Sequence, residues 1–158
     1  MKTATVTEIK KELKFRSTEE VQQLCLRLSK FKKENKELLT YLLFEASDEE
    51  TYIQSVKNEI DTHFQNITHT NFYYIKKSVR KVLRETKKYI RYSQKKETEV
   101  ELLLYFCEQL KSFKPSIQRN TTLKNLYDRQ LDFIDKKIEK LHEDLQYDYT
   151  IEIEELRN

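Results

Sequence analysis

Six basic residues between positions 77 and 95 follow one another at steps of three or four, the spacing that aligns side chains along one face of an α-helix. On a helix that advances about 100° per residue, all six lie within about 40° of one line. The row consists of Lys77, Lys81, Arg84, Lys88, Arg91 and Lys95. We expect Tyr73, Tyr74 and Tyr92 to project beside it. Such a row suits a polyanion, because lysine and arginine neutralise phosphates and aromatic rings stack on unpaired bases.

The segment that carries this row is strongly basic in a nearly neutral chain. Residues 71–96 hold ten Lys or Arg and the single acidic residue Glu85, so their net charge is +9 against +3 for all 158 residues. Apolar residues occupy the opposite side of the predicted helix: Ile75, Val79, Val82, Leu83 and Ile90. Two acidic segments, 45–50 and 143–158, could pair with the basic row. Three interpretations stay open: a solvated face, a nucleic-acid site and a site for an acidic protein.

The histidines show no spacing that favours a metal site. His63 and His69 are six residues apart, so they do not share a helical face, and no cysteine lies nearby to complete a tetrahedral site. Glu139 and His142 have the Glu-x-x-His spacing of di-iron helical bundles, but that site needs two such pairs and the chain has one. We therefore expect no bound metal.

The absence of glycine excludes several classes of enzyme. None occurs in 158 residues, whereas phosphate-binding loops, dinucleotide fingerprints and nucleophile elbows all need glycine for their turns. Cys25 and Cys107 each lie in an apolar helical pattern without a histidine nearby, so we interpret them as small buried hydrophobic residues. We expect neither a cofactor nor catalytic activity.

The elements that must position the basic row are predicted to be helices throughout. A single proline leaves long stretches uninterrupted, and three pairs have capping-box spacing: Thr5 with Glu8, Ser17 with Glu20 and Ser47 with Glu50. Apolar periodicity predicts seven helices, near residues 6–14, 18–32, 36–46, 48–66, 71–93, 97–113 and 121–147. With glycine absent, we expect asparagine to take the left-handed position after a helix, at Asn35, Asn66 or Asn71, and Asn120.

We predict that residues 1–158 form one all-α domain, an irregular antiparallel bundle of six or seven helices. The nearly all-apolar stretch 100–107 places helix 97–113 at its centre. A short α-solenoid of helical hairpins is the alternative architecture. Residues 148–158 are either docked on the bundle or form a flexible acidic tail.

The last predicted helix carries an apolar seam with alternating steps of four and three residues, as in a coiled coil. Its members are Tyr127, Leu131, Ile134, Ile138, Leu141 and Leu145. The seam packs either on the core of its own chain, which would leave a monomer, or on a second copy, which would give a homodimer through helix 121–147.

The sequence favours a cytoplasmic protein without membrane association. The first residues lack the apolar core of a secretory signal, and the longest apolar run, 102–107, is far shorter than a bilayer span. We expect a non-catalytic helical protein-interaction module that presents the charged surface of helices 71–93 and 121–147 to a macromolecular partner of unknown identity. The alternative is a sequence-nonspecific nucleic-acid-binding protein that uses the basic, tyrosine-flanked face of helix 71–93.

Overall fold

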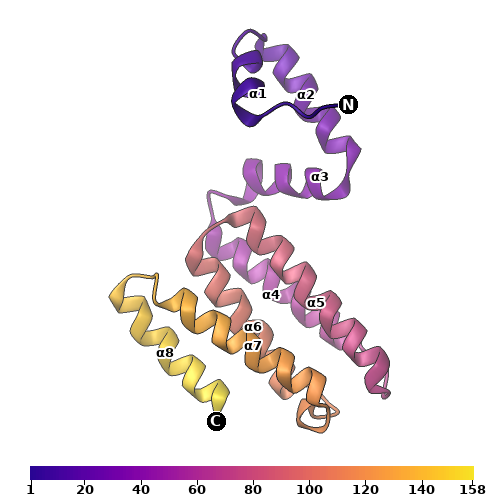
Figure 1. Ribbon diagram of the computed structural model, residues 1–158, viewed down its shortest axis with the longest axis vertical. Helices are drawn as coiled ribbons and strands as arrows, with labels where there is room; N and C mark the ends of the chain where they lie inside the picture. The colour runs from indigo at the N-terminus through magenta and orange to yellow at the C-terminus, as the bar shows by residue number, and fades with distance from the viewer. The chain divides into compact units, whose positions relative to one another are not determined.

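The protein is all-α, as predicted, in a computed structural model that describes residues 1–158 (Figure 1). It contains eight α-helices, one more than the upper end of the expected range, and no strand. None of them combines the length and the apolar character that crossing a bilayer requires. The elements are α1 (Val6–Leu13), α2 (Thr18–Phe31), α3 (Lys33–Thr40), a π-helical turn η1 (Tyr41–Glu45), α4 (Glu49–Gln65), α5 (Phe72–Ser93), α6 (Lys96–Ser112), a 3₁₀ turn η2 (Ile117–Arg119), α7 (Thr121–Ile138) and α8 (Glu143–Arg157).

Contacts within the chain divide it into two compact units. Unit 1 comprises Met1–Phe44 and unit 2 comprises Glu45–Asn158. The packing of the helices differs between the units. Helices α1, α2 and α3 bury none of their residues, whereas α4 to α8 all contribute buried side chains to the core of unit 2.

Unit 1 is organised by local hydrogen bonds. Two of the predicted capping boxes are present, Thr5 with Glu8 at the start of α1 and Ser17 with Glu20 at the start of α2. Helices α2 and α3 pack against each other, and Asn35 ties them together because its Nδ2 donates a hydrogen bond to the carbonyl oxygen of Leu28 at 2.8 Å.

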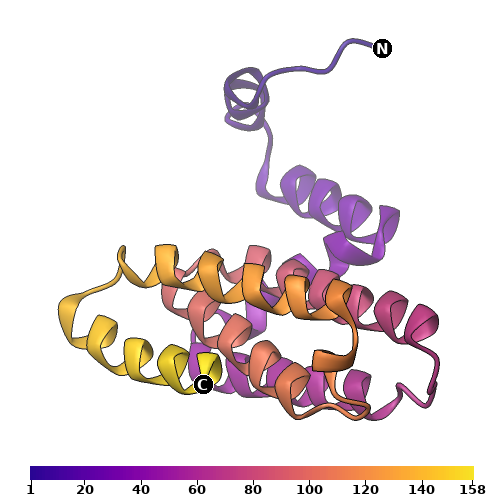
Figure 2. The ribbon, with the colours of Figure 1, turned by 60° about the horizontal axis from the view of Figure 1, so that its bottom comes forward.

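Unit 2 is a bundle built around α6, as the apolar stretch 100–107 predicted. Helix α6 packs against α4, α5, α7 and α8 (Figures 1 and 2). Its buried residues cover about two thirds of its circumference, and Val100, Leu102, Phe106, Cys107 and Leu110 are all completely covered. The remaining side carries exposed or partly exposed residues: Glu97, Glu101, Tyr105 and Glu108. A helix with so wide an apolar face is stable only when neighbouring helices cover that face, so α6 lies at the centre of unit 2.

The prediction of one continuous helix over 121–147 is wrong. Helix α7 ends at Ile138, and α8 begins after His142, whose ring nitrogen accepts a hydrogen bond from the amide of Asp144. The side-chain amide of Gln146 donates to the carbonyl oxygen of Leu141 at 2.8 Å and so satisfies a backbone group at the break. Periodicity spans this break because both helices turn an apolar face to the same core.

The seam packs within its own chain. Its first four members, Tyr127, Leu131, Ile134 and Ile138, are at most 5% exposed inside unit 2. They are therefore not available for the dimer contact through helix 121–147 that the sequence left open.

The acidic C-terminus is docked on the bundle as part of α8. Ile153 is buried at 2% exposure, and the hydroxyl of Tyr127 donates to the carbonyl oxygen of Leu156 at 2.7 Å. Lys111 donates to the same carbonyl at 3.2 Å, and Arg157 pairs with two aspartates of α7. Residues 148–158 thus belong to the fold of unit 2.

The left-handed position is taken by a glutamine, not by asparagine. Gln94, directly after α5, has φ 60° and ψ 5°, and no other residue has positive φ. Asn71 and Asn120 instead cap the starts of α5 and α7 with their side chains, and Asn66 is right-handed. Asparagine is favoured both as the N-cap of a helix and in the left-handed position after a helix. An asparagine between two apolar periodic segments therefore does not show whether it ends one helix or begins the next.

Candidate polyanion-binding face

Helix α5 holds its basic residues outward because its opposite side is anchored in the core of unit 2. Ile75 and Val79 are completely covered and Val82 is 3% exposed, and the helix packs against α4 and α6. The side-chain oxygen of Asn71 accepts a hydrogen bond from the amide of Tyr73 at 2.8 Å and starts the helix. Helix α5 therefore has one apolar side, which is buried in the core, and one basic side, as the sequence predicts.

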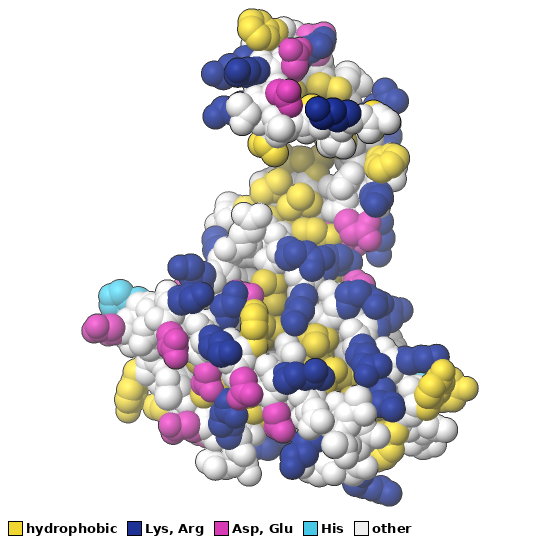
Figure 3. Space-filling model, viewed as in Figure 1, with side chains coloured by type: hydrophobic (Ala, Val, Ile, Leu, Met, Phe, Trp, Pro, Cys, Tyr) yellow, Lys and Arg dark blue, Asp and Glu magenta, His cyan; other side chains and the backbone are white.

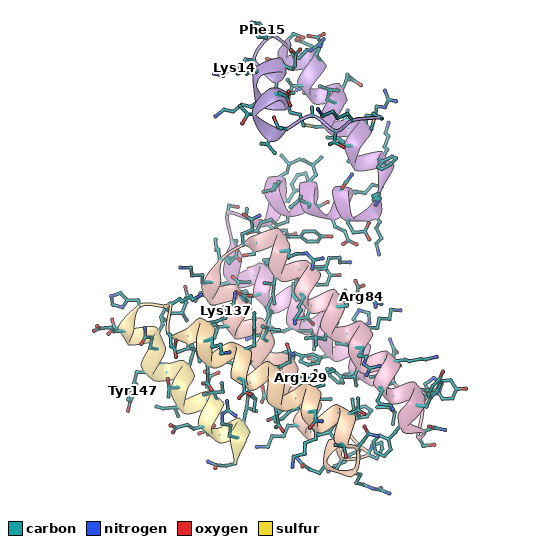
Figure 4. The ribbon with its side chains drawn as sticks, viewed as in Figure 1. Lys14, Phe15, Arg84, Arg129, Lys137 and Tyr147 are labelled. Carbon is teal, nitrogen blue, oxygen red and sulfur yellow. The ribbon has the colours of Figure 1, made fainter.

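Five of the six predicted cations are exposed: Lys77, Lys81, Arg84, Arg91 and Lys95. Lys and Arg side chains gather over α5 in the space-filling view (Figure 3), and Figure 4 shows Arg84 on this face. None of Lys81, Arg84 and Arg91 forms a salt bridge. The middle of the row is therefore not neutralised by a carboxylate.

Lys88 does not belong to the exposed row. It is only 9% exposed, and its Nζ lies 2.6 Å from Oε2 of Glu85 and 5.0 Å from the centre of the Tyr89 ring. The ion pair and the cation–π contact offset the free-energy cost of removing the Lys88 ammonium group from water. A helical wheel places a side chain relative to its own helix only, so it could not show this burial.

Tyr92, which we expected to project beside the basic row, is buried instead. It is 9% exposed, and its ring meets that of Tyr89 edge to face, with centroids 6.1 Å apart. The expectation that Tyr92 projects beside the cations is wrong, because this ring is used in packing.

Lys95 is exposed but paired. Its Nζ lies 3.1 Å from Oε2 of Glu49, at the start of α4. Oε1 of Glu49 accepts hydrogen bonds from the hydroxyls of Thr98, at 2.6 Å, and Ser93. Glu49 thus ties α4 to the turn between α5 and α6, and Lys95 is part of that structural network.

An exposed aromatic cluster lies at the opposite end of the row. Tyr73 and Tyr74 are 55% and 48% exposed, and their rings meet edge to face with centroids 5.2 Å apart. The ring of His69 stacks on Tyr74 at 5.0 Å, and Nζ of Lys77 lies 4.3 Å from the centre of the Tyr73 ring. The sequence analysis did not place His69 in this cluster, although its position just before α5 is the signal for this contact.

Helix α7 adjoins the basic face. Nζ of Lys87 on α5 lies 5.5 Å from the ring of Phe133 on α7, and Nζ of Lys137 lies 4.8 Å from the same ring. Lys137 is paired with Glu99 at 2.8 Å, whereas Arg129 is exposed without such a partner. Figure 4 shows Arg84, Arg129 and Lys137 on one side of unit 2. The sequence included this helix in the charged surface but did not show which cations adjoin α5.

Charge is segregated among the helices of unit 2. Eight basic residues and one acidic residue give α5 a net charge of +7. Helices α4, α6 and α8 are acidic, with net charges of −3, −2 and −5. The acidic stretch 143–158, which could have covered the basic row, is in α8, and α8 packs against α6 and α7.

The acidic helices line an open pocket of about 470 Å³ between α4, α6 and α8. Lys57 and Glu101 pair across it at 2.7 Å. Burial, followed by the charge of Glu101, raises the pKa of Glu152 above its usual range, and burial raises the pKa of the Tyr149 hydroxyl to about 12. Glu101, Glu108, Glu152 and Glu155 all line this pocket, so negative charge is concentrated on this side of unit 2.

The structure shows no metal-binding cluster, and the two cysteines differ in exposure. No group of three or more His, Cys, Asp or Glu side chains is arranged to hold a metal ion. Cys107 is completely covered, and burial raises the pKa of its thiol to about 12, whereas Cys25 is exposed, contrary to our expectation.

Comparison of the chain with protein-family models, curated proteins and solved structures found no match.

Proposed function

We propose that this protein is a non-catalytic helical protein-interaction module that binds an acidic protein through the basic face of α5. The observation that carries the proposal is the exposed row Lys77, Lys81, Arg84 and Arg91, in which Lys81, Arg84 and Arg91 form no salt bridge.

The concentration of charge on one helix favours binding over mere solubility. Solubility requires charge of either sign anywhere on the surface, whereas unit 2 concentrates seven net positive charges on α5 and ten negative charges on α4, α6 and α8 together. A one-signed patch raises the local potential and steers an oppositely charged partner toward it.

Nucleic acid is the second candidate for the same face, and the aromatic cluster of His69, Tyr73 and Tyr74 favours it. Exposed rings beside a cationic row match the way single strands are bound, with bases stacked on rings and phosphates on cations. The row from Tyr74 to Arg91 spans about 26 Å at 1.5 Å per residue. Contacts to phosphates carry no sequence information, so this binding would be sequence-nonspecific.

The test is fluorescence anisotropy of the full chain with labelled poly-glutamate and with labelled single- and double-stranded oligonucleotides, from about 50 to 200 mM salt. Four phosphate contacts predict a log–log slope of about −3 on a single strand. Substitution of Lys77, Lys81, Arg84 and Arg91 by Glu should abolish binding. The matched control reverses four exposed lysines of unit 1, Lys10, Lys11, Lys14 and Lys30, and should retain it.

Two further variants separate the candidates. Tyr73→Ala and Tyr74→Ala should weaken binding of a single strand by roughly 5- to 150-fold each, the range for loss of one stacked base. They should leave poly-glutamate binding unchanged. If the fourfold reversal on α5 binds both probes as well as the control variant does, the α5 face is not the site.

A further inference from the structure

Unit 1 carries apolar residues on its helices but has almost no core, because Tyr41 is its one buried residue. None of the residues of α1, α2 and α3 is buried, although Ile9, Leu13 and Leu24 are apolar and 46%, 41% and 43% exposed. Helices of 8 to 14 residues are marginal in water unless an apolar face is covered. Units near 40 residues usually need a metal, disulfides or oligomerisation to fold.

The exposed residues gather in a groove of about 730 Å³ between α1 and α2. Ile9, Leu13 and Leu24 line it. At the end near the link between the helices, Arg16 approaches Glu12 and Glu20 at 3.9 and 3.6 Å. Figure 4 marks this link at Lys14 and Phe15.

On the α2 side of the groove, each end carries one charged residue that forms no salt bridge, and the two charges have opposite sign. Glu19 lines the end near the link, beside the Arg16 network, and forms no salt bridge. Arg27 lines the groove about two turns further along α2, and it also forms no salt bridge. The free positive charge and the free negative charge are therefore about 12 Å apart along the same helix.

We propose that the groove of unit 1 is filled by the same groove of a second copy, in a two-fold symmetric homodimer. A two-fold axis across the groove exchanges its ends, so Arg27 of each copy meets Glu19 of the other. Ile9, Leu13 and Leu24 of the two copies then cover one another. A surface used twice in this way must be complementary to itself, and the charges of Glu19 and Arg27 meet that requirement. This inference concerns a different surface from α5 and does not depend on the proposed function.

The test is sedimentation velocity of the full chain between about 1 and 100 μM. We expect a dimer that dissociates on dilution. Arg27→Glu and Glu19→Lys, both on exposed positions, should each raise the dimer dissociation constant by roughly tenfold, because every substitution acts twice and replaces attraction by repulsion. The double variant with both substitutions restores opposite charges and should restore the dimer.

Leu24→Glu provides a second, independent variant. It places a charge on the floor of the groove and should leave a monomer, while circular dichroism confirms the helix content and anisotropy confirms that binding through α5 is unchanged. A monomer at all concentrations would overturn the proposal and would mean that another protein or another part of the same chain covers the groove. Failure of the double charge exchange to restore the dimer would overturn it as well.

Discussion

Replacement of Gln94 by glycine should stabilise unit 2, although most substitutions destabilise a protein. Gln94 follows the last turn of α5 with φ 60°, and its amide donates to the carbonyl oxygen of Ile90 at 2.9 Å. This is the left-handed cap for which glycine is the usual residue. The side chain of Gln94 is exposed, so its removal leaves the core intact.

The size of the effect follows from two opposing terms. The left-handed conformation costs a residue with a β-carbon about 1–2 kcal/mol. Glycine loses about 0.5–1 kcal/mol more backbone entropy when the chain folds. The difference predicts a gain of about 0.5–1 kcal/mol in the free energy of unfolding, or a rise in Tm of about 1–4 °C for a protein of this size.

Thermal unfolding followed by circular dichroism at 222 nm measures the effect, with two control variants. Gln94→Ala keeps the β-carbon and should give no gain. Gln54→Gly, on the exposed side of α4, should lower stability by about 1 kcal/mol, as glycine does inside a helix. A Tm for Gln94→Gly at or below that of Gln94→Ala would refute the argument from backbone conformation.

Three further predictions concern Glu49, Glu152 and the two cysteines. Glu49→Ala should lower the free energy of unfolding by about 2–4 kcal/mol in urea titrations, since it leaves the buried hydroxyl of Thr98 without its charged acceptor. Glu152→Gln should raise Tm at pH 7: because its pKa is raised, the folded state binds the proton more tightly than the unfolded chain, and stability falls as pH rises through and above 4.5. The variant should lose that dependence in a pH series of melts. A thiol reagent at pH 8 should label Cys25 in the native protein but Cys107 only after denaturation; equal labelling would contradict the packing of α6.

The helical class, the starts of α1 and α2 and the central place of α6 could all be predicted from the sequence. Each depends on interactions within one segment: Thr5 with Glu8, Ser17 with Glu20, and the apolar residues from Val100 to Cys107. Such signals are local, and the structure confirms them.

The burial of particular residues could not be predicted, because it depends on contacts between segments far apart in the sequence. Lys88 and Tyr92 have the helical phase of an exposed row, yet both are buried. Leu24 and Cys25 have the phase of a core stripe, yet both are exposed. The break between α7 and α8 was hidden for the same reason, since both helices turn apolar residues to one core and the periodicity continues across it.

The pairing of charges could be predicted from the sequence only in part. Glu49, in the acidic segment 45–50, does pair with Lys95 of the basic row. The formal charges of α5 and of the acidic C-terminus allowed them to cover one another, whereas α8 packs on α6 and α7, and Arg157 pairs with Asp132 and Asp135. The unpaired state of Lys81 and Arg84 is therefore a result of the fold, and it is the basis of the proposed function.

The most direct test of the α5 face is an amide and arginine side-chain NMR titration of the full chain with a short single-stranded oligonucleotide and, separately, with poly-glutamate. We predict that the resonances that shift most belong to Lys77, Lys81, Arg84 and Arg91, and that a single strand also shifts Tyr73 and Tyr74. Shifts confined to other helices, or none with either probe at low salt, would contradict the account.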